Sequence, residues 1–394
     1  MVTLSSAENA LKSVYLGVVS NQLNINANPL LGKIKQSTKD VWGKEVRKMA
    51  PYGINGGIGA GTETDALPKA AGNNYVQFVT DLKNLYGKIE LSDKAIRASE
   101  NNAGAFVNLL NDEMEGLIKA SSFNFGRMLY GDGSGLLATV TAFDSSAKSA
   151  TLDSVKNLIE GMVIDVYTSG VKNEAKSGAR IKYVDRVNNK VFTETNVEFA
   201  EGDKIYVQNS KDFEITGLGK IFSGSDTLYG LSREEYPWLS PYKKENAGEI
   251  SDGLIQSAID FLEEVSGSTV NYIACSSAVR RAYQEYLGAY RRNIDVQELA
   301  GGYKAISYNG IPLVADRFVA DDTMYLLNSD DFTLHQLCDW KWLEGEDGRV
   351  IRQNMGFPTY SATLVKYADL ICDKPNGQAK ISGILGTVTN PFTA

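Results

Sequence analysis

One stretch of the sequence, residues 99–135, carries a helical repeat about two to three times as long as a usual helix. Its apolar residues recur three or four positions apart, which places them on one helix face: Phe106, Val107, Leu110, Met114, Leu117 and Ile118. Ser99 can cap the first turn. The stretch ends in Gly131–Gly135, where glycines permit a sharp exit. At about 1.5 Å per residue the helix would span on the order of 40 Å, so we interpret it as a structural spine.

The length, the net charge and the cysteine content of the chain exclude several classes of protein. The chain has 394 residues, enough for about two or three domains. Its formal charge of −8 argues against binding nucleic acid through a net positive field. Three irregularly spaced cysteines argue against a disulfide framework or a zinc site. With neither a signal peptide nor an apolar stretch of spanning length, we expect a soluble protein made in the cytosol, with no membrane partner.

The segments before the spine predict an arm and a hairpin. Residues 1–40 begin with a short amphipathic helix and continue as a polar, extended arm. Residues 41–95 show a period of two, which is typical of strands, around a glycine-rich apex at 52–74. We therefore predict a long two-stranded hairpin with a flexible tip. Because an isolated ribbon is marginally stable in water, we expect it to rest on a partner.

The segments after the spine predict further β and α/β units. Residues 137–216 resemble a small barrel or sandwich, with strands at Val163–Tyr167, Arg180–Val187, Lys190–Glu194 and Lys204–Val207. Residues 217–247 carry strand pieces. Residues 248–322 combine strands with two helices, one capped by Ser251 and the other by Ser276 or Ser277. Residues 323–394 are predicted to be β throughout.

This order of elements resembles the major capsid proteins of tailed bacteriophages with the Hong Kong 97 fold. The resemblance covers nearly the whole chain and depends on the order and spacing of four passages: Gly131–Gly135 after the long helix, Gly301–Tyr303 with Tyr308–Leu313, Trp340–Val350, and Tyr360–Pro375. It implies an α+β fold with an N-terminal arm, an extended β-hairpin loop, a spine helix with a peripheral β-sheet, an axial α/β domain and a small inserted β-barrel-like domain.

The resemblance also assigns a place to each segment. The arm is 1–40, the extended loop 41–95, the spine 96–136, the insertion 137–216, the peripheral strands 217–247, the axial domain 248–322 and the closing peripheral sheet 323–394. Because the arm starts close to Met1, without the helical scaffolding segment of many family members, we expect any scaffolding to come from a separate protein.

The function that this implies is structural. We expect hexamers and pentamers of an icosahedral shell around double-stranded DNA, assembled in the bacterial host cytoplasm and carried in the virion, with portal and decoration proteins as further partners. An encapsulin-like compartment that encloses a cargo enzyme is an alternative within the same fold. A hydrolytic or carbohydrate-active enzyme on a β scaffold is an alternative of a different class.

Several residues could in principle bind a cofactor or a metal ion or act as acids and bases, but a structural role explains each of them better. Gly56–Gly61 lacks the Gly-Lys-Ser/Thr of a phosphate loop and the preceding apolar strand of a dinucleotide site. His335 is the only histidine, which excludes a two-histidine metal site. The acidic pairs at 321–322 and 330–331 lie in turn-like surroundings. We expect no catalytic residue, no metal and no cofactor.

Charged residues at the expected edges are the candidates for contacts between subunits. The arginine pair at 291–292 lies near tyrosines that suit a packed interface. Some relatives link a loop lysine covalently to a neighbour's asparagine, for which Lys69 and Asn354 would be the pair, and we expect non-covalent contact instead. The full set of candidates is Arg47, Lys48, Glu63, Asp65, Lys69, Arg291, Arg292, Asp347, Arg349 and Asn354.

Overall fold

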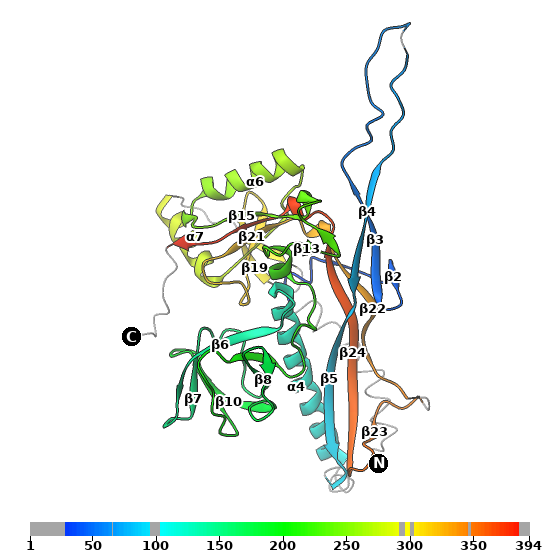
Figure 1. The fold of residues 1–394 in the computed structure, drawn as a ribbon. Coiled ribbons are helices and arrows are strands. Elements are labelled where there is room, and N and C mark those ends of the chain that lie inside the picture. The colour runs from blue at the N-terminus through cyan, green and yellow to red at the C-terminus, as the bar shows by residue number, and fades with distance from the viewer. Residues whose placement is uncertain are drawn as a thin grey trace.

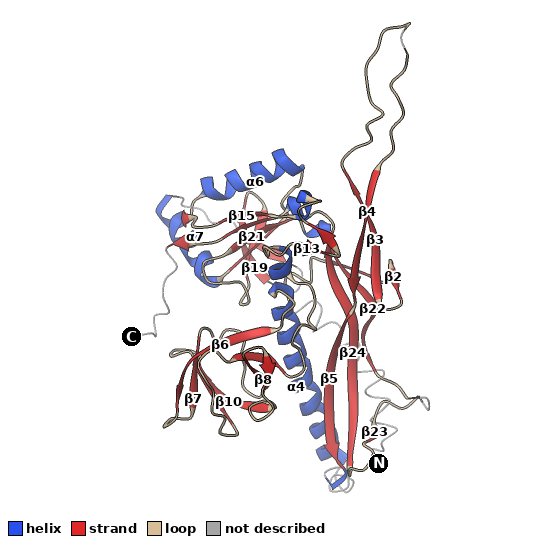
Figure 2. Ribbon diagram, in the orientation of Figure 1, coloured by secondary structure: helices blue, strands red, loops and turns tan. Residues whose placement is uncertain are grey.

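The spine helix α4 (Ala103–Tyr130) is central to the computed structural model, which describes residues 28–64, 66–94, 103–290, 296–299, 303–345 and 348–385. A long sheet follows one side of the helix, a small barrel lies beside it, and an α/β body lies at its C-terminal end (Figure 1). Strands predominate in the described residues (Figure 2). None of the helices among those residues has the length and apolar character needed to cross a membrane.

The long amphipathic helix predicted from the sequence is confirmed. Its 28 residues give a length of about 42 Å. The buried side includes Met114, Ile118 and Leu129, each at most 5% exposed, while Glu115 and Lys119 face solvent. The exit turns through Gly133 and Gly135, both at positive φ. Ser99, the predicted cap, lies outside the described residues.

The long sheet joins segments that are far apart in the sequence. In it β24 pairs antiparallel with β5, β22 and β23, and β22 pairs in parallel with β1. The strands are β1 (Lys35–Ser37), β5 (Lys83–Ser92), β22 (Phe332–Trp342), β23 (Arg352–Gln353) and β24 (Thr359–Cys372). α4 packs closely on β5, because a Cβ added at Gly87 would lie 2.8 Å from Leu117 Cδ1. Only glycine permits this approach without a shift.

A separate ribbon carries the glycine-rich apex. It consists of β2 (Val41–Trp42), β3 (Glu45–Tyr52) and β4 (Asn74–Asp81), and β3 pairs with β4 from Glu45↔Asp81 to Tyr52↔Asn74. Residues 53–73 extend beyond these strands and project from the molecule (Figure 1). The hairpin prediction is thus confirmed for 45–81. It was wrong in including 83–92 in the hairpin, because β5 finds its partner in β24, a pairing that local alternation cannot show.

The inserted unit is a closed barrel. Its strand order is β10–β11–β7–β6–β12–β8, and the β8–β10 pairing closes the ring. The strands are β6 (Leu136–Asp144), β7 (Ser149–Leu152), β8 (Val163–Thr168), β9 (Val171–Lys172), β10 (Ala179–Asp185), β11 (Lys190–Thr193) and β12 (Lys204–Val207). The sequence pattern does not reveal β6 and β7, because both strands contain small residues and their pairing has a register shift between Val140 and Ala142.

The α/β body is a second sheet covered by two helices. Its order is β15–β25–β21–β17–β20–β19–β18. The strands are β15 (Tyr242–Lys244), β17 (Tyr272–Cys275), β18 (Val296–Leu299), β19 (Tyr303–Tyr308), β20 (Ile311–Ala315), β21 (Met324–Leu327) and β25 (Ala379–Ile381). Helix α6 (Asp252–Ser266) is capped by Ser251, whose Oγ accepts from the Leu254 amide at 3.2 Å. Helix α7 (Ser277–Tyr290) is capped in the same way by Ser276.

Three strands of this body differ from the sequence expectation. β21 and β25 fall within 323–394, which was expected to close the peripheral sheet, and they pair in the α/β sheet instead. β15 falls within 217–247, which was expected to supply peripheral strands, and it pairs with β25 in the same α/β sheet. The remaining short elements are α5 (Leu218–Ile221), β13 (Thr227–Leu228), β14 (Leu231–Ser232), η3 (Pro237–Leu239), β16 (Gly248–Glu249), η4 (Ser329–Asp331), η5 (Pro375–Gly377) and β26 (Ile384–Leu385).

Candidate inter-subunit surfaces

The projecting loop, defined as residues 53–73, exposes large apolar side chains. Ile54, Ile58 and Leu67 are 75%, 76% and 89% exposed. Exposed apolar groups gathered on one segment indicate an interaction site. Glu63 and Lys69 are exposed on the same loop, and Asp65 lies outside the described residues.

The root of the ribbon, in contrast, is firmly attached to the long sheet. Asp369 of β24 is fully buried and accepts hydrogen bonds from Thr80 Oγ1 at 2.6 Å and from the Thr216 amide at 2.7 Å. Burial raises the pKa of Asp369, and these hydrogen bonds act in the opposite direction. Lys48 Nζ lies 2.7 Å from Asp373 Oδ2. The loop therefore extends from a fixed base.

Several predicted contact residues have partners within their own chain. Arg47 pairs with Glu45 at 2.9 Å, and Lys48 pairs with Asp373 as described. Arg349 is exposed at the end of the long sheet, and its carbonyl accepts from the Gly345 amide. Three other predicted contact residues lie outside the described residues, namely Arg291, Arg292 and Asp347.

The pair named for a covalent link is not brought together within one chain. Lys69 lies on the projecting loop, whereas Asn354 lies beside β23 at the opposite end of the long sheet (Figure 1). Both polar side-chain atoms of Asn354 form hydrogen bonds with nearby residues of the same chain. Its Nδ2 donates to Thr359 Oγ1 at 2.8 Å, and its Oδ1 accepts from Ser361 Oγ at 2.7 Å.

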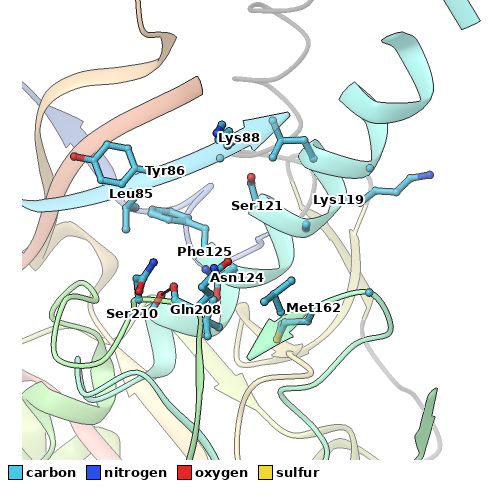
Figure 3. A pocket seen from close by; sticks show the side chains of 18 of the residues that line it. Leu85, Tyr86, Lys88, Lys119, Ser121, Asn124, Phe125, Met162, Gln208 and Ser210 are labelled. Carbon is cyan, nitrogen blue, oxygen red and sulfur yellow. Dashed lines mark hydrogen bonds between the residues drawn. The ribbon is translucent and has the colours of Figure 1, made fainter. Parts of the chain in front are cut away.

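A groove of about 860 Å³ lies where the long sheet, α4 and the barrel meet. β5 forms one wall with Leu85, Tyr86 and Lys88, and α4 contributes the neighbouring wall (Figure 3). The insertion supplies the third wall, lined by Met162, Arg180, Gln208, Ser210 and Phe213. Sequence reasoning missed this groove because its walls come from three distant segments and no single motif marks it.

A buried ion pair fixes the barrel wall to the helix. Arg127 of α4 donates to both carboxylate oxygens of Glu214, with Nη1 2.9 Å from Oε2. The two side chains are 4% and 2% exposed. Asn124 accepts from the same guanidinium at 2.6 Å. The chain also crosses the end of α4 very closely, because a Cβ added at Gly217 would lie 2.2 Å from the Met128 carbonyl oxygen.

The histidine and two of the acidic residues that were considered as possible catalytic or metal-binding groups are buried or form ion pairs within the chain. His335 is 1% exposed, and its Nδ1 lies 3.0 Å from the Lys39 carbonyl oxygen. Burial lowers the pKa of His335. Asp321 pairs with Lys156 and Asp330 with Lys35. Within the described ranges, no three His, Cys, Asp or Glu residues gather in a way that could hold a metal ion.

Comparison with known proteins identifies the fold. Over 95% of its length the chain is similar to 93% of a chain in the cyanophage A-1(L) capsid asymmetric unit, with a TM-score of 0.51 and 13% identity. It is also similar to a structure from the mycobacterium phage Adephagia (TM-score 0.46, 8% identity, 93% and 92% covered) and to an encapsulin complex from Synechococcus elongatus (TM-score 0.43, 9% identity, 82% and 81% covered). No protein-family model matches the sequence, and no curated protein matches it. The cyanophage similarity confirms the predicted Hong Kong 97-type capsid fold.

Proposed function

We propose that this chain is the major capsid protein of a tailed phage or prophage. It assembles into hexamers and pentamers of an icosahedral shell that encloses double-stranded DNA, and its role is structural rather than enzymatic. It is made in the bacterial host cytoplasm and becomes part of the virion head. A portal, a separate scaffolding protein and a decoration protein are its expected partners, and its contact with the DNA is non-specific.

The observation that carries this proposal is the projecting loop on a capsid fold. A ribbon whose root is held by the buried Asp369 extends a segment with exposed Ile54, Ile58 and Leu67 away from the rest of the chain. Such a segment gains stability when another surface covers its apolar side chains. Among copies of one chain, this is most simply achieved by neighbours in a closed assembly.

The division into regions follows the same reasoning. The α/β body lies at one end of the molecule and the tip of the long sheet at another (Figure 1). We assign the α/β body (residues 248–322 together with β15, β21 and β25) to capsomer centres and the long sheet to threefold contacts, with the loop and the arm (1–40) across neighbours. The candidate contact residues of the loop, Glu63, Asp65 and Lys69, belong to this crossing. The charge of −8 suits a container that must release its DNA.

The loop provides the direct test. Since Tyr52 and Asn74 pair at the end of the ribbon, residues 53–73 can be replaced by an Asn-Gly turn that closes the hairpin. The purified variant is expected to match the circular dichroism and the unfolding midpoint of the unmodified chain, yet fail to form stable shells by electron microscopy and sedimentation. Normal shells from this variant would refute the role of the loop.

The unmodified chain tests the proposal as a whole. Expressed alone or with its expected scaffolding partner, it should form rings or shells visible by electron microscopy. A discrete monomer under all of these conditions would overturn the capsid assignment. Genomic DNA inside particles from infected or induced cells supports a phage head, whereas an enclosed enzyme would assign the chain to a compartment shell.

A further inference from the structure

We propose that Asn55, in the projecting loop, is a modification site at which the folded chain deamidates without an enzyme. The Gly56 backbone nitrogen loses its proton to a solvent base and attacks Asn55 Cγ. The N–Cγ bond forms, the Cγ–Nδ2 bond breaks, and the side-chain nitrogen takes a proton from solvent and leaves as ammonia. Water then opens the succinimide ring at either carbonyl group, which leaves aspartate or isoaspartate at position 55. The reaction requires no reactant other than water.

The sequence offers three candidates for this reaction. Asn55, Asn309 and Asn376 are each followed by glycine. A following glycine favours the reaction, because no Cβ hinders the approach of its nitrogen and because its backbone adopts a wide range of conformations. Asparagine is among the thermolabile residues of proteins. The three positions differ in how the fold holds the reacting atoms.

The surroundings of Asn55 leave the reacting atoms accessible. Asn55 and Gly56 are both exposed, in a described stretch of the loop that has no helix or strand. The Gly56 amide donates no hydrogen bond to any residue that the structure describes. Asn55 Oδ1 accepts from the Gly57 amide at 2.9 Å, which forms an Asx turn. This turn folds the side chain back toward the following peptide bond and polarises its carbonyl group, so that Cγ is a better electrophile.

Asn309 is held by a hairpin. Asn309 and Gly310 form the two-residue turn between β19 and β20, and both have positive φ. The pairing of Tyr308 with Ile311 closes this turn and fixes its backbone. Asn309 Nδ2 also donates to Gln256 Oε1 at 3.3 Å. Deamidation at position 309 therefore requires the hairpin to open first.

Asn376 lies in η5, where the nitrogen that would attack already has a partner. The Gly377 amide donates to the Lys374 carbonyl oxygen at 3.0 Å. Gly377 is buried, and a Cβ added there would lie 2.7 Å from Ser268 Oγ. The peptide bond cannot turn toward the Asn376 side chain without local unfolding. Of the three positions, only Asn55 can react in the folded chain.

Peptide mapping of purified, unassembled subunits measures the three rates. Trypsin releases residues 49–69 and 305–317, in which Asn55 and Asn309 respectively are the only asparagines. During incubation at mildly alkaline pH, position 55 should convert about tenfold or more faster than positions 309 and 376, because only the latter two need local opening. Chromatography should separate two acidic products, aspartate and isoaspartate. In urea the three rates should converge. Equal rates at the three positions of the folded chain would overturn the inference.

Two glycine variants of the loop test the mechanism. G56A places a methyl group beside the attacking nitrogen and should slow the conversion of Asn55 about tenfold or more. G61A adds a Cβ that meets no atom within 4 Å and does not follow an asparagine, so it should leave the rate unchanged. Both variants should keep the circular dichroism of the unmodified chain. Equal conversion of Asn55 in G56A and G61A would contradict attack by the Gly56 nitrogen.

The deamidated loop is a poorer contact surface, a consequence that rests on the proposed function. A carboxylate beside the exposed Ile54 must lose its hydration when a neighbour covers the loop. Subunits aged before assembly should therefore give fewer shells than fresh subunits, whereas aged N55Q subunits should assemble like fresh ones. An equal loss of shells in both chains would overturn this consequence. The conversion of Asn55 is measured in unassembled subunits, so its outcome is independent of whether the chain forms shells.

Discussion

Replacing Arg127 with methionine should loosen the attachment of the barrel to the spine helix. The substitution keeps an apolar chain in place and removes the cation that faces Glu214, a residue only 2% exposed. A carboxylate left buried without its partner costs about 3–5 kcal/mol of folding free energy. The Asn124 carbonyl oxygen, which accepts from the same guanidinium, also loses its donor. The free energy of unfolding should therefore fall by an amount near the upper part of that range.

An exposed pair with the same geometry provides the control. Arg186 contacts Glu160 through two hydrogen bonds, of 2.9 and 3.0 Å, but the two side chains are 50% and 42% exposed. R186M should lower the free energy of unfolding by about 1 kcal/mol or less, because solvent screens the ion pair and replaces its hydrogen bonds. The double variant R127M/E214L should recover most of the stability lost in R127M, since no uncompensated charge remains buried.

Urea unfolding of unassembled subunits, followed by tryptophan fluorescence and circular dichroism, measures these differences. Stability should decrease in the order unmodified chain, R186M, double variant and R127M. The reasoning would be refuted if R127M were no less stable than R186M, or if the double variant were as unstable as R127M. Either result would mean that solvent or a local rearrangement compensates Glu214.

Two further predictions concern the packing at the helix end and the single histidine. G217A should lower the free energy of unfolding by about 1–3 kcal/mol, because the added Cβ would clash with the Met128 carbonyl oxygen. G224A should leave it nearly unchanged, because a Cβ at Gly224 has no atom within 4 Å. The unfolding midpoints of the two variants check both expectations. Burial lowers the pKa of His335, so the unfolded chain takes up a proton at a higher pH than the folded chain. Stability should consequently fall as the pH drops from about 7.5 to about 5.5, with a smaller change in H335Q.

Features with a strong local signal were predicted well from the sequence. The α4 periodicity, the Ser251 cap and the strand at Lys204–Val207 are each determined by neighbours along the chain, and the structure has them where expected. Pairing between distant segments carries no such signal. For that reason the partner of β5 and the place of β21 in the α/β sheet emerged only from the structure.

The candidate surfaces divide in the same way. The loop is recognisable because glycine and apolar residues stand together between two alternating strands. The groove is not, since it depends on how β5, α4 and the insertion meet in space. The sequence also does not show whether a charged side chain is buried. Lys366 is 0% exposed and lies 2.7 Å from Asp339 Oδ1, although a lysine in a strand ordinarily faces solvent.

The two ends of the inserted barrel lie side by side. The Asp212 amide donates to the Ser134 carbonyl at 2.9 Å, and a Cβ added at Gly135 would lie 2.7 Å from the Ser210 carbonyl oxygen. The covalent path of the surrounding scaffold is therefore nearly the same with the barrel as it would be with a short turn in its place. An ancestral gene could gain or lose this module in one recombination event, and a foreign domain with adjacent termini can be grafted at the same point.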